Sequence, residues 1–182
     1  MLRIAICDDE AQYVHQTAKL VQEYLGGRPG LSRQVFPFRL GGGLLCQVEE
    51  AGGFDLSLLD IIMPGLNGIE TGRQLRQLGD GGEIVYLTTS ADYAVDSYSV
   101  RAFFYLLKPL EKDRLFQVLD AAVKKLDERR SKAVLITTKD GSRRVLLDQI
   151  LYVERVGRSL RYYCSGGAVG SLGLRVPFHT PV

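Results

Sequence analysis

Short apolar runs alternate with longer amphipathic stretches over the first 130 residues of the chain. The apolar runs have the length of buried strands and cover residues 3–7, 34–38, 56–59, 84–87 and 103–107. The stretches between them have helical spacing and cover residues 14–25, 44–51, 69–78, 91–100 and 115–126. Strands that alternate with helices imply right-handed crossovers and a parallel sheet covered on both faces. The pattern predicts an α/β fold over residues 1–130, with a doubly wound five-stranded parallel sheet.

The pattern changes after a charge-rich stretch at residues 124–132, which we expect to carry the last helix into a linker. Four shorter strand-like runs follow, at residues 134–138, 143–146, 150–154 and 160–164. Asp-Gly and Ser-Gly-Gly sequences between or after these runs are hairpin signals. Residues 172–182 show no clear strand pairing, and their prolines discourage one. Residues 131–182 are therefore predicted to form a partial all-β segment.

Composition, cysteines and length are those of an ordinary globular protein. No apolar run approaches the roughly 20 residues that span a bilayer, and the first residues have the pattern of a buried strand, not that of a signal peptide. Cys7, Cys46 and Cys164 lie far apart, without the spacing of a zinc site or a disulfide framework. We expect a cytoplasmic protein with free thiols and no membrane association.

Charge is distributed unevenly along the chain. Residues 1–131 hold 15 Lys and Arg against 18 Asp and Glu, whereas residues 132–182 hold 8 against 3, a balance of +5. A basic segment that follows an acidic domain favours a polyanionic partner for the second part. An ordinary solvated basic face remains the alternative.

Polar residues directly follow four of the predicted strands. They are Asp8 and Asp9, Asp60, Thr88 and Lys108. The carboxyl ends of neighbouring parallel strands converge on one crevice. Adjacent carboxylates favour a hard divalent cation, most simply Mg²⁺, while an ammonium and a hydroxyl suit phosphoryl oxygens. This set predicts metal-assisted phosphoryl transfer to Asp60.

Four motifs carry a resemblance to a known family. They are Ile-Cys-Asp-Asp-Glu at 6–10, Leu-Asp-Ile-Ile-Met-Pro-Gly-Leu-Asn-Gly at 59–68, Tyr-Leu-Thr-Thr-Ser at 86–90 and Tyr-Leu-Leu-Lys-Pro at 105–109. With them, residues 1–130 resemble the receiver domain of bacterial two-component response regulators, which has a flavodoxin-like fold.

The run Gly41, Gly42 and Gly43 is not followed by Gly-Lys-Ser or Gly-Lys-Thr, so we expect a loop there and no phosphate-binding loop.

The resemblance implies a role for each residue of the predicted site. Asp60 would be the phosphoacceptor. The metal ligands would be Asp8, Asp9, Asp60 and the main-chain carbonyl of Ile62. Thr88 and Lys108 would be the switch hydroxyl and lysine, and Tyr105 the rotating switch aromatic. The apolar pattern around Tyr105 fits a core tyrosine equally well. The bond from Lys108 to Pro109 would be cis, a state that costs about 0.5–1 kcal/mol.

Residues 136–163 resemble the start of the LytTR DNA-binding domain, an all-β output module. In that family, loops between strands contact DNA. The expected DNA contacts are therefore Arg155, Arg158, Ser159 and Arg161, with arginine suited to guanine edges and phosphates. Solvated arginines on strand edges are the alternative. The sequence stops at Val182, short of a complete LytTR domain, which leaves a chain without working DNA binding as an alternative expectation.

The resemblances together imply a response regulator that controls transcription. A sensor histidine kinase would phosphorylate Asp60, and residues 91–125 would then form a homodimer face that brings two output domains to DNA. Self-phosphorylation and slow self-dephosphorylation are the only reactions expected. A protein–protein signalling receiver without DNA binding is the alternative. A phosphatase of the haloacid dehalogenase type is disfavoured. Such enzymes carry their nucleophile in an Asp-x-Asp motif after the first strand, whereas here an Asp-Asp pair follows the first strand and the single Asp60 follows the third.

Overall fold

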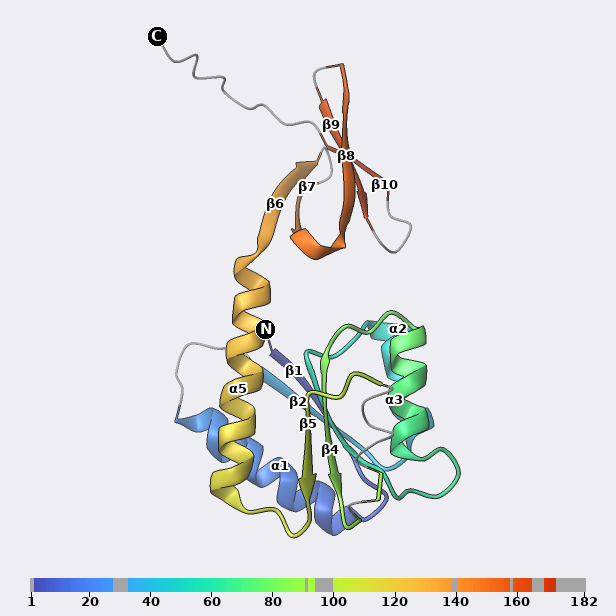
Figure 1. Cartoon of the computed structure of the whole chain (residues 1–182), viewed down its shortest axis with the longest axis vertical. Coiled ribbons are helices and arrows are strands. Elements are labelled where there is room, and N and C mark those ends of the chain that lie inside the picture. The colour runs from blue at the N-terminus through green and yellow to red at the C-terminus, as the bar shows by residue number, and fades with distance from the viewer. Residues whose placement is uncertain are drawn as a thin grey trace. The chain divides into compact units, whose positions relative to one another are not determined.

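The computed structural model describes residues 2–27, 33–90, 92–93, 100–138, 141–157, 159–164 and 169–172. Internal contacts divide the chain into two compact units, Met1–Val123 and Lys124–Val182. Both are drawn in Figure 1, and each is described by itself. The first unit is an α/β domain and the second consists mainly of strands.

A five-stranded parallel sheet forms the centre of the first unit, with the strand order β2-β1-β3-β4-β5. The strands are β1 (Leu2–Cys7), β2 (Arg33–Phe38), β3 (Leu56–Asp60), β4 (Glu83–Thr88) and β5 (Phe104–Leu107). Each pair of neighbours is parallel. The predicted doubly wound fold is therefore confirmed.

Helices cover both faces of the sheet. They are α1 (Ala11–Gly26), α2 (Gly41–Ala51), α3 (Gly68–Gln77) and α5 (Lys112–Ser131). Figure 1 shows α1 and α5 along one face and α2 and α3 along the other. The helix predicted at residues 91–100 falls mostly outside the described residues. The last helix continues through the charged stretch at 124–131, where we expected a transition to a linker.

The hydrophobic core lies on both sides of the sheet because alternate strand residues point to opposite faces. On β1, Ala5 and Cys7 belong to a cluster with Leu59 and Tyr86 on the α2 and α3 side. Their neighbours in the same strand, such as Ile6, are also buried and point to the other face. Burial on both faces explains why β1, β3 and β4 appear in the sequence as continuous apolar runs.

The glycines at residues 41–43 form the first turn of α2, so the loop expected there was wrong. Close packing of α2 on α3 explains the glycine at position 41. A Cβ atom on Gly41 would lie 2.1 Å from Thr71 Oγ1 and 3.3 Å from the Leu66 side chain. The position therefore requires a residue without a side chain, although glycine is a poor helix former.

The second unit contains two small antiparallel sheets. A hairpin pairs β6 (Ala133–Thr138) with β7 (Gly141–Leu146). The other sheet has the order β10-β9-β8, from β8 (Ile150–Val156), β9 (Ser159–Cys164) and β10 (Val169–Leu172). Figure 1 draws these strands in orange and red. The sequence pattern predicted the first four strands but not β10, which is only four residues long.

A small core holds the second unit together. Ile136 and Val145 are buried, and Ile150, Tyr162 and Cys164 pack against them. Among the described helices of the whole chain, none combines the length and apolar character needed to cross a membrane.

Candidate functional site

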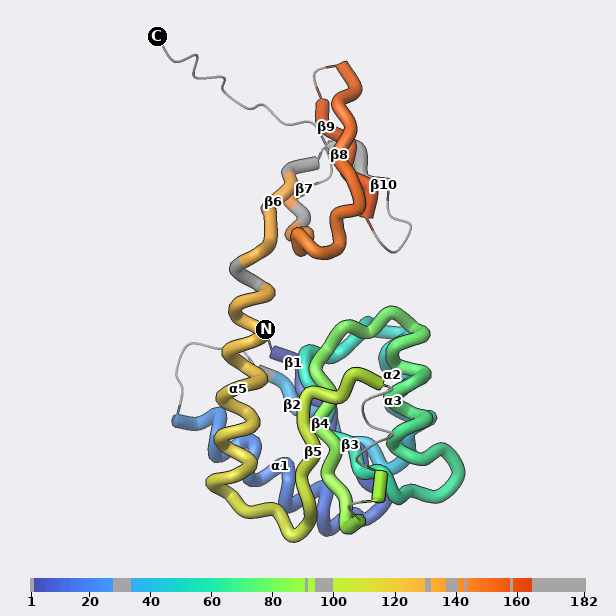
Figure 2. Tube along the Cα trace, in the orientation of Figure 1, coloured from blue at the N-terminus to red at the C-terminus, as the bar shows by residue number. Residues whose placement is uncertain are grey.

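Strand register brings the predicted site residues to one edge of the sheet. Cys7 pairs with Leu59, Asp60 with Leu87, and Thr88 with Leu107. The residues that follow β1 and β5 therefore lie at the same edge as the ends of β3 and β4. Figure 2 shows the carboxyl ends of these strands at the lower end of the first unit.

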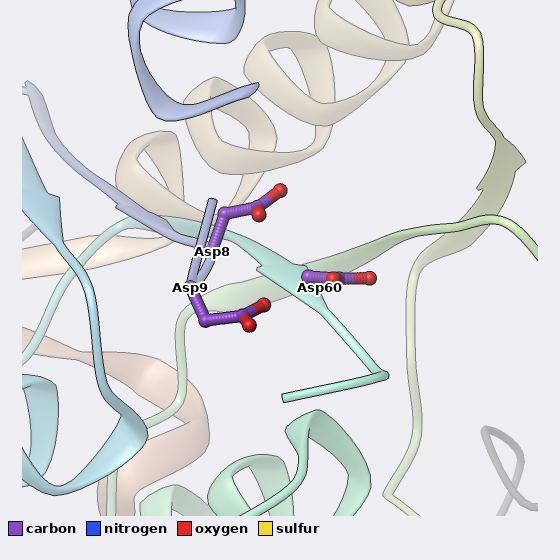
Figure 3. A group of neighbouring side chains, drawn as sticks. All are labelled: Asp8, Asp9 and Asp60. Carbon is purple, nitrogen blue, oxygen red and sulfur yellow. The ribbon is translucent and has the colours of Figure 1, made fainter. Parts of the chain in front are cut away.

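Three carboxylates meet at this edge. The candidate ligand oxygens of Asp8, Asp9 and Asp60 all lie within 4.8 Å of one another. Figure 3 shows Asp8 and Asp9 following β1 and Asp60 at the end of β3, with their carboxylates directed into a common space. Asp8 is further held in place because its Oδ1 accepts a hydrogen bond from the Glu10 backbone N–H at 3.0 Å.

Lys108 joins two of these acids. Its Nζ lies 2.7 Å from Asp8 Oδ2 and 3.2 Å from Asp60 Oδ2. The side chains of Lys108, Asp8 and Asp60 are 2%, 4% and 7% exposed, so these ion pairs are buried. Burial opposes the charge on Lys108, but the hydrogen bond to Asp8 and the charge of Asp60 outweigh it. The pKa of Lys108 therefore lies above its ordinary value of 10.5.

The negative charge of the Asp60 carboxylate is only partly compensated by its partners. Its Oδ1 is buried and has no hydrogen-bond partner among the described residues. Burial raises the pKa of Asp60 above its ordinary value of 3.8, although the Lys108 charge opposes this. The folded chain therefore holds this proton to a higher pH than the unfolded chain does. In the absence of a cation, the Asp60 contribution to the free energy of unfolding falls as pH rises through the range above 3.8.

The residues of this cluster fit a divalent cation. Three carboxylates supply hard oxygen ligands of the kind that Mg²⁺ prefers. The unpartnered Oδ1 of Asp60 is a buried acceptor that a cation would satisfy. Lys108 carries one positive charge against three carboxylates, so two negative charges remain at the cluster when all are ionised.

Thr88 and Tyr105 are linked through the residues that follow β4. Thr88 is fully buried, and the Ser90 backbone N–H lies 3.4 Å from its Oγ1. The Tyr105 hydroxyl donates a hydrogen bond to the Ser90 carbonyl. Tyr105 is partly exposed and packs against the core cluster of the first unit, so the core role that its apolar neighbours allowed stays open. Its hydroxyl therefore bonds the loop that begins at the carboxyl end of β4.

Ile62 and Pro109 lie in the loops that follow β3 and β5. Ile62 is 48% exposed, and the neighbouring Ile61 carbonyl accepts hydrogen bonds from the Met63 and Gly68 backbone N–H groups at 3.1 and 3.0 Å. The peptide bond from Lys108 to Pro109 is cis, as the resemblance implied.

Two residues that the sequence reasoning missed contact the site. Arg39, in the loop after β2, donates to the Asp9 carbonyl from Nε at 2.8 Å and also from Nη2. The ring of Tyr13, on α1, lies over the Lys108 ammonium at 4.1 Å from Nζ to the ring centroid. Neither arginine nor tyrosine by itself indicates phosphoryl transfer. The one signal for Tyr13 is its place in the first turn of a helix that follows the acidic run.

The described candidate DNA contacts of the second unit, Arg155, Ser159 and Arg161, lie on β8 and β9, which pair as neighbours. Arg155 is exposed near the end of β8, and its Nε donates to the Gly157 carbonyl at 3.2 Å. Ser159 begins β9. Arg161 lies inside β9, not in a loop, opposite Glu154. Arg158 lies outside the described residues.

Comparisons with known proteins match the first unit. A family model described as the response regulator receiver domain matches residues 4–120. An uncharacterized response regulatory protein of Vibrio cholerae is 34% identical over 110 residues, which are 60% of this chain and 40% of that protein. The sensory transduction protein LytT of Oceanobacillus iheyensis is 30% identical over 112 residues, which are 58% of this chain and 46% of LytT.

A third relative is the transcriptional regulatory protein NatR of Bacillus subtilis, 29% identical over 109 residues, which are 59% of this chain and 47% of NatR. The chain thus covers less than half of the length of these curated relatives. Among solved structures, the response regulatory domain of MrkE from Klebsiella pneumoniae superposes with a TM-score of 0.62 at 22% identity, covering 70% of this chain and 99% of that one. At 22% identity, the likeness to the MrkE domain shows the fold alone.

Proposed function

Because the chain belongs to the response regulator receiver domain family, we propose that it takes up a phosphoryl group on Asp60 from a sensor histidine kinase. The observation that carries this proposal is the meeting of Asp8, Asp9 and Asp60 within 4.8 Å, with Lys108 bonded to two of them. The phosphoryl group would pass to the Asp60 carboxylate with no other reaction than its later slow hydrolysis.

In the proposed transfer, a carboxylate oxygen of Asp60 attacks the phosphorus atom of a phosphohistidine. The new P–O bond forms as the P–N bond breaks, and the electron pair stays on the imidazole nitrogen, which takes up a proton. A Mg²⁺ ion held by Asp8, Asp9, Asp60 and the Ile62 carbonyl would screen the negative charges that must approach one another. The Lys108 ammonium, whose Nζ lies 3.2 Å from Asp60 Oδ2, would donate a hydrogen bond to a phosphoryl oxygen.

The hydroxyl of Thr88 would bond a second phosphoryl oxygen. Support for this role comes from its position at the end of β4, directly beside the β3 end that carries Asp60. Movement of Thr88 would reach Tyr105 through Ser90, which contacts both residues. We propose that this displacement changes the face made by residues 91–125 and favours a homodimer, a charge-driven bias of a two-state element.

Replacement of one carboxylate tests the metal part of this proposal. Asp9→Asn is expected to lower the affinity for Mg²⁺ by at least about tenfold, because it removes one charged oxygen ligand and leaves the Lys108 ion pairs intact. Isothermal titration calorimetry measures the affinity, and labelling from acetyl phosphate should then need correspondingly more Mg²⁺. The exposed acid Asp127 on α5 supplies the control variant Asp127→Asn. Equal Mg²⁺ affinity in both variants would contradict the assignment.

We also propose that residues 131–182 belong to a LytTR-type DNA-binding output, so that the chain regulates transcription. The names of NatR and LytT, a transcriptional regulator and a sensory transduction protein, support an output of this kind. The balance of 8 basic against 3 acidic residues over 132–182 favours a polyanionic ligand. Arg155 and Ser159, which flank one turn, are the described residues best placed to contact it.

A filter-binding experiment with a pool of random duplex DNA tests the output. The acetyl phosphate-treated chain is expected to retain several times more DNA than the untreated chain, because a dimer doubles the contacts. Arg155→Ala should reduce retention by about tenfold. The matched control is Arg73→Ala, which removes an exposed arginine that pairs with Glu70 on α3 of the first unit. No retention in any form would instead favour a receiver that acts through protein contacts alone.

A further inference from the structure

The Lys108 ammonium is enclosed on three sides. Asp8 Oδ2 and Asp60 Oδ2 lie 2.7 and 3.2 Å from Nζ, and the Tyr13 ring centroid lies 4.1 Å from it. An ammonium has three N–H donors and no acceptor, and two carboxylates and one ring face supply an equal number of partners. A lysine that is only 2% exposed has little water to replace any of these partners.

The position of Tyr13 follows from the start of α1. This helix begins at Ala11, directly after the acidic run, so Tyr13 lies in its first turn, four residues after Asp9. The flanking residues Val14 and Thr17 are buried and fix the first turns of the helix against the sheet. The Tyr13 ring is therefore held by a helix whose first turns are fixed. None of the residues proposed to bind the metal or the phosphoryl group lies within this helix.

We propose that Tyr13 is a positioning residue that holds the Lys108 ammonium at the phosphorylation site through the face of its ring. This role rests on the proposed function. Phosphorylation changes Asp60 from a carboxylate into an acyl phosphate, so one of the two acidic partners of Lys108 is altered during the reaction. The ring face of Tyr13 stays the same before and after transfer. It keeps the ammonium within reach of the incoming oxygens and out of water.

Three replacements separate the ring face from the hydroxyl and from simple bulk. Tyr13→Phe keeps the ring face, Tyr13→Leu removes it, and pentafluorophenylalanine at position 13 keeps the shape but reverses the ring quadrupole. The readout is the initial rate of labelling from acetyl phosphate, a donor too small to contact α1 as a partner protein would. We expect Tyr13→Leu and the pentafluoro variant to label about tenfold more slowly than the parent. Tyr13→Phe should stay within about twofold.

Two further measurements distinguish positioning from a structural role. In NMR spectra, the Lys108 Cε protons should be shifted upfield by the ring in the parent and in Tyr13→Phe, and this shift should be lost in Tyr13→Leu. In a Lys108→Met background, Tyr13→Leu should cause no further loss of labelling, because its effect passes through the lysine. The NMR signal does not depend on phosphorylation, so it reports the contact by itself.

The outcomes are separable. If the parent takes up no label, the proposed function fails and the role of Tyr13 fails with it. If the parent is labelled but Tyr13→Leu is labelled at the same rate, this inference alone is overturned. Equal proportional losses in the parent and Lys108→Met backgrounds, or a Tyr13→Phe variant as slow as Tyr13→Leu, would overturn it too. The Phe and pentafluoro pair has one shape, so it still decides the matter if Tyr13→Leu does not fold.

Discussion

Asp60→Asn is expected to lower labelling from acetyl phosphate in the presence of Mg²⁺ by at least about a hundredfold, as the loss of a nucleophile generally does. An amide oxygen is a far weaker nucleophile than a carboxylate oxygen, and the replacement also removes one charged ligand from the Asp8, Asp9 and Asp60 cluster. Incorporation of radioactive phosphate, followed by peptide mapping, measures the effect and shows which carboxylate carries the label.

The variant should keep its fold, which makes the loss interpretable. Asparagine has the shape of aspartate, and Lys108 retains its shorter ion pair with Asp8 at 2.7 Å. Because burial raises the pKa of Asp60, removing this charge should leave the thermal midpoint at neutral pH unchanged or higher when no divalent cation is present. Asp127→Asn on the exposed part of α5 is the control and should label like the parent. Undiminished labelling of Asp60→Asn would refute the phosphoacceptor assignment.

The central strands β1, β3 and β4 could be predicted because their burial leaves continuous apolar runs. All five residues of β3 are buried, including the Asp60 that ends it. The prediction failed where the reason for a residue lies in another element. Glycines at 41–43 are ordinary loop formers, yet Gly41 is required by the approach of Thr71 on α3. The strand β10 has only four residues, Val-Gly-Ser-Leu, and is defined by its pairing with β9.

The acidic site could be predicted for a different reason. Parallel strands place their carboxyl ends at one edge whatever their sequences, so Asp8, Asp60 and Lys108 converge by topology. No comparable rule predicts which residues contact the acids and the lysine from outside the strand ends. Arg39 bonds the main-chain carbonyl of Asp9, an acceptor that every residue carries. Tyr13 reaches Lys108 only because of the direction of its ring, which a sequence pattern does not encode.

Lys108→Met is expected to destabilise the chain by about 3 kcal/mol in a buffer without divalent cations. The replacement keeps an unbranched side chain of similar length but removes the positive charge between two carboxylates that are 4% and 7% exposed. A buried carboxylate without its partner costs far more than an exposed one. Urea unfolding followed by circular dichroism measures the change. Labelling from acetyl phosphate should also fall steeply, because no ammonium remains to hold a phosphoryl oxygen.

The divalent ion and pH then distinguish lost charge compensation from lost packing. Mg²⁺ should stabilise Lys108→Met more than it stabilises the parent, since it meets a cluster with one more uncompensated negative charge. Acid should do the same, because protonation of Asp60 removes the repulsion, so the difference between variant and parent should shrink as pH falls towards 4. Lys112→Met is the matched control, as Lys112 pairs with Glu23 at the surface, where the two side chains are 49% and 51% exposed. This control should change stability little. If Lys108→Met were as stable as Lys112→Met without Mg²⁺, or if Mg²⁺ stabilised both equally, the acidic cluster would not be held together by this lysine.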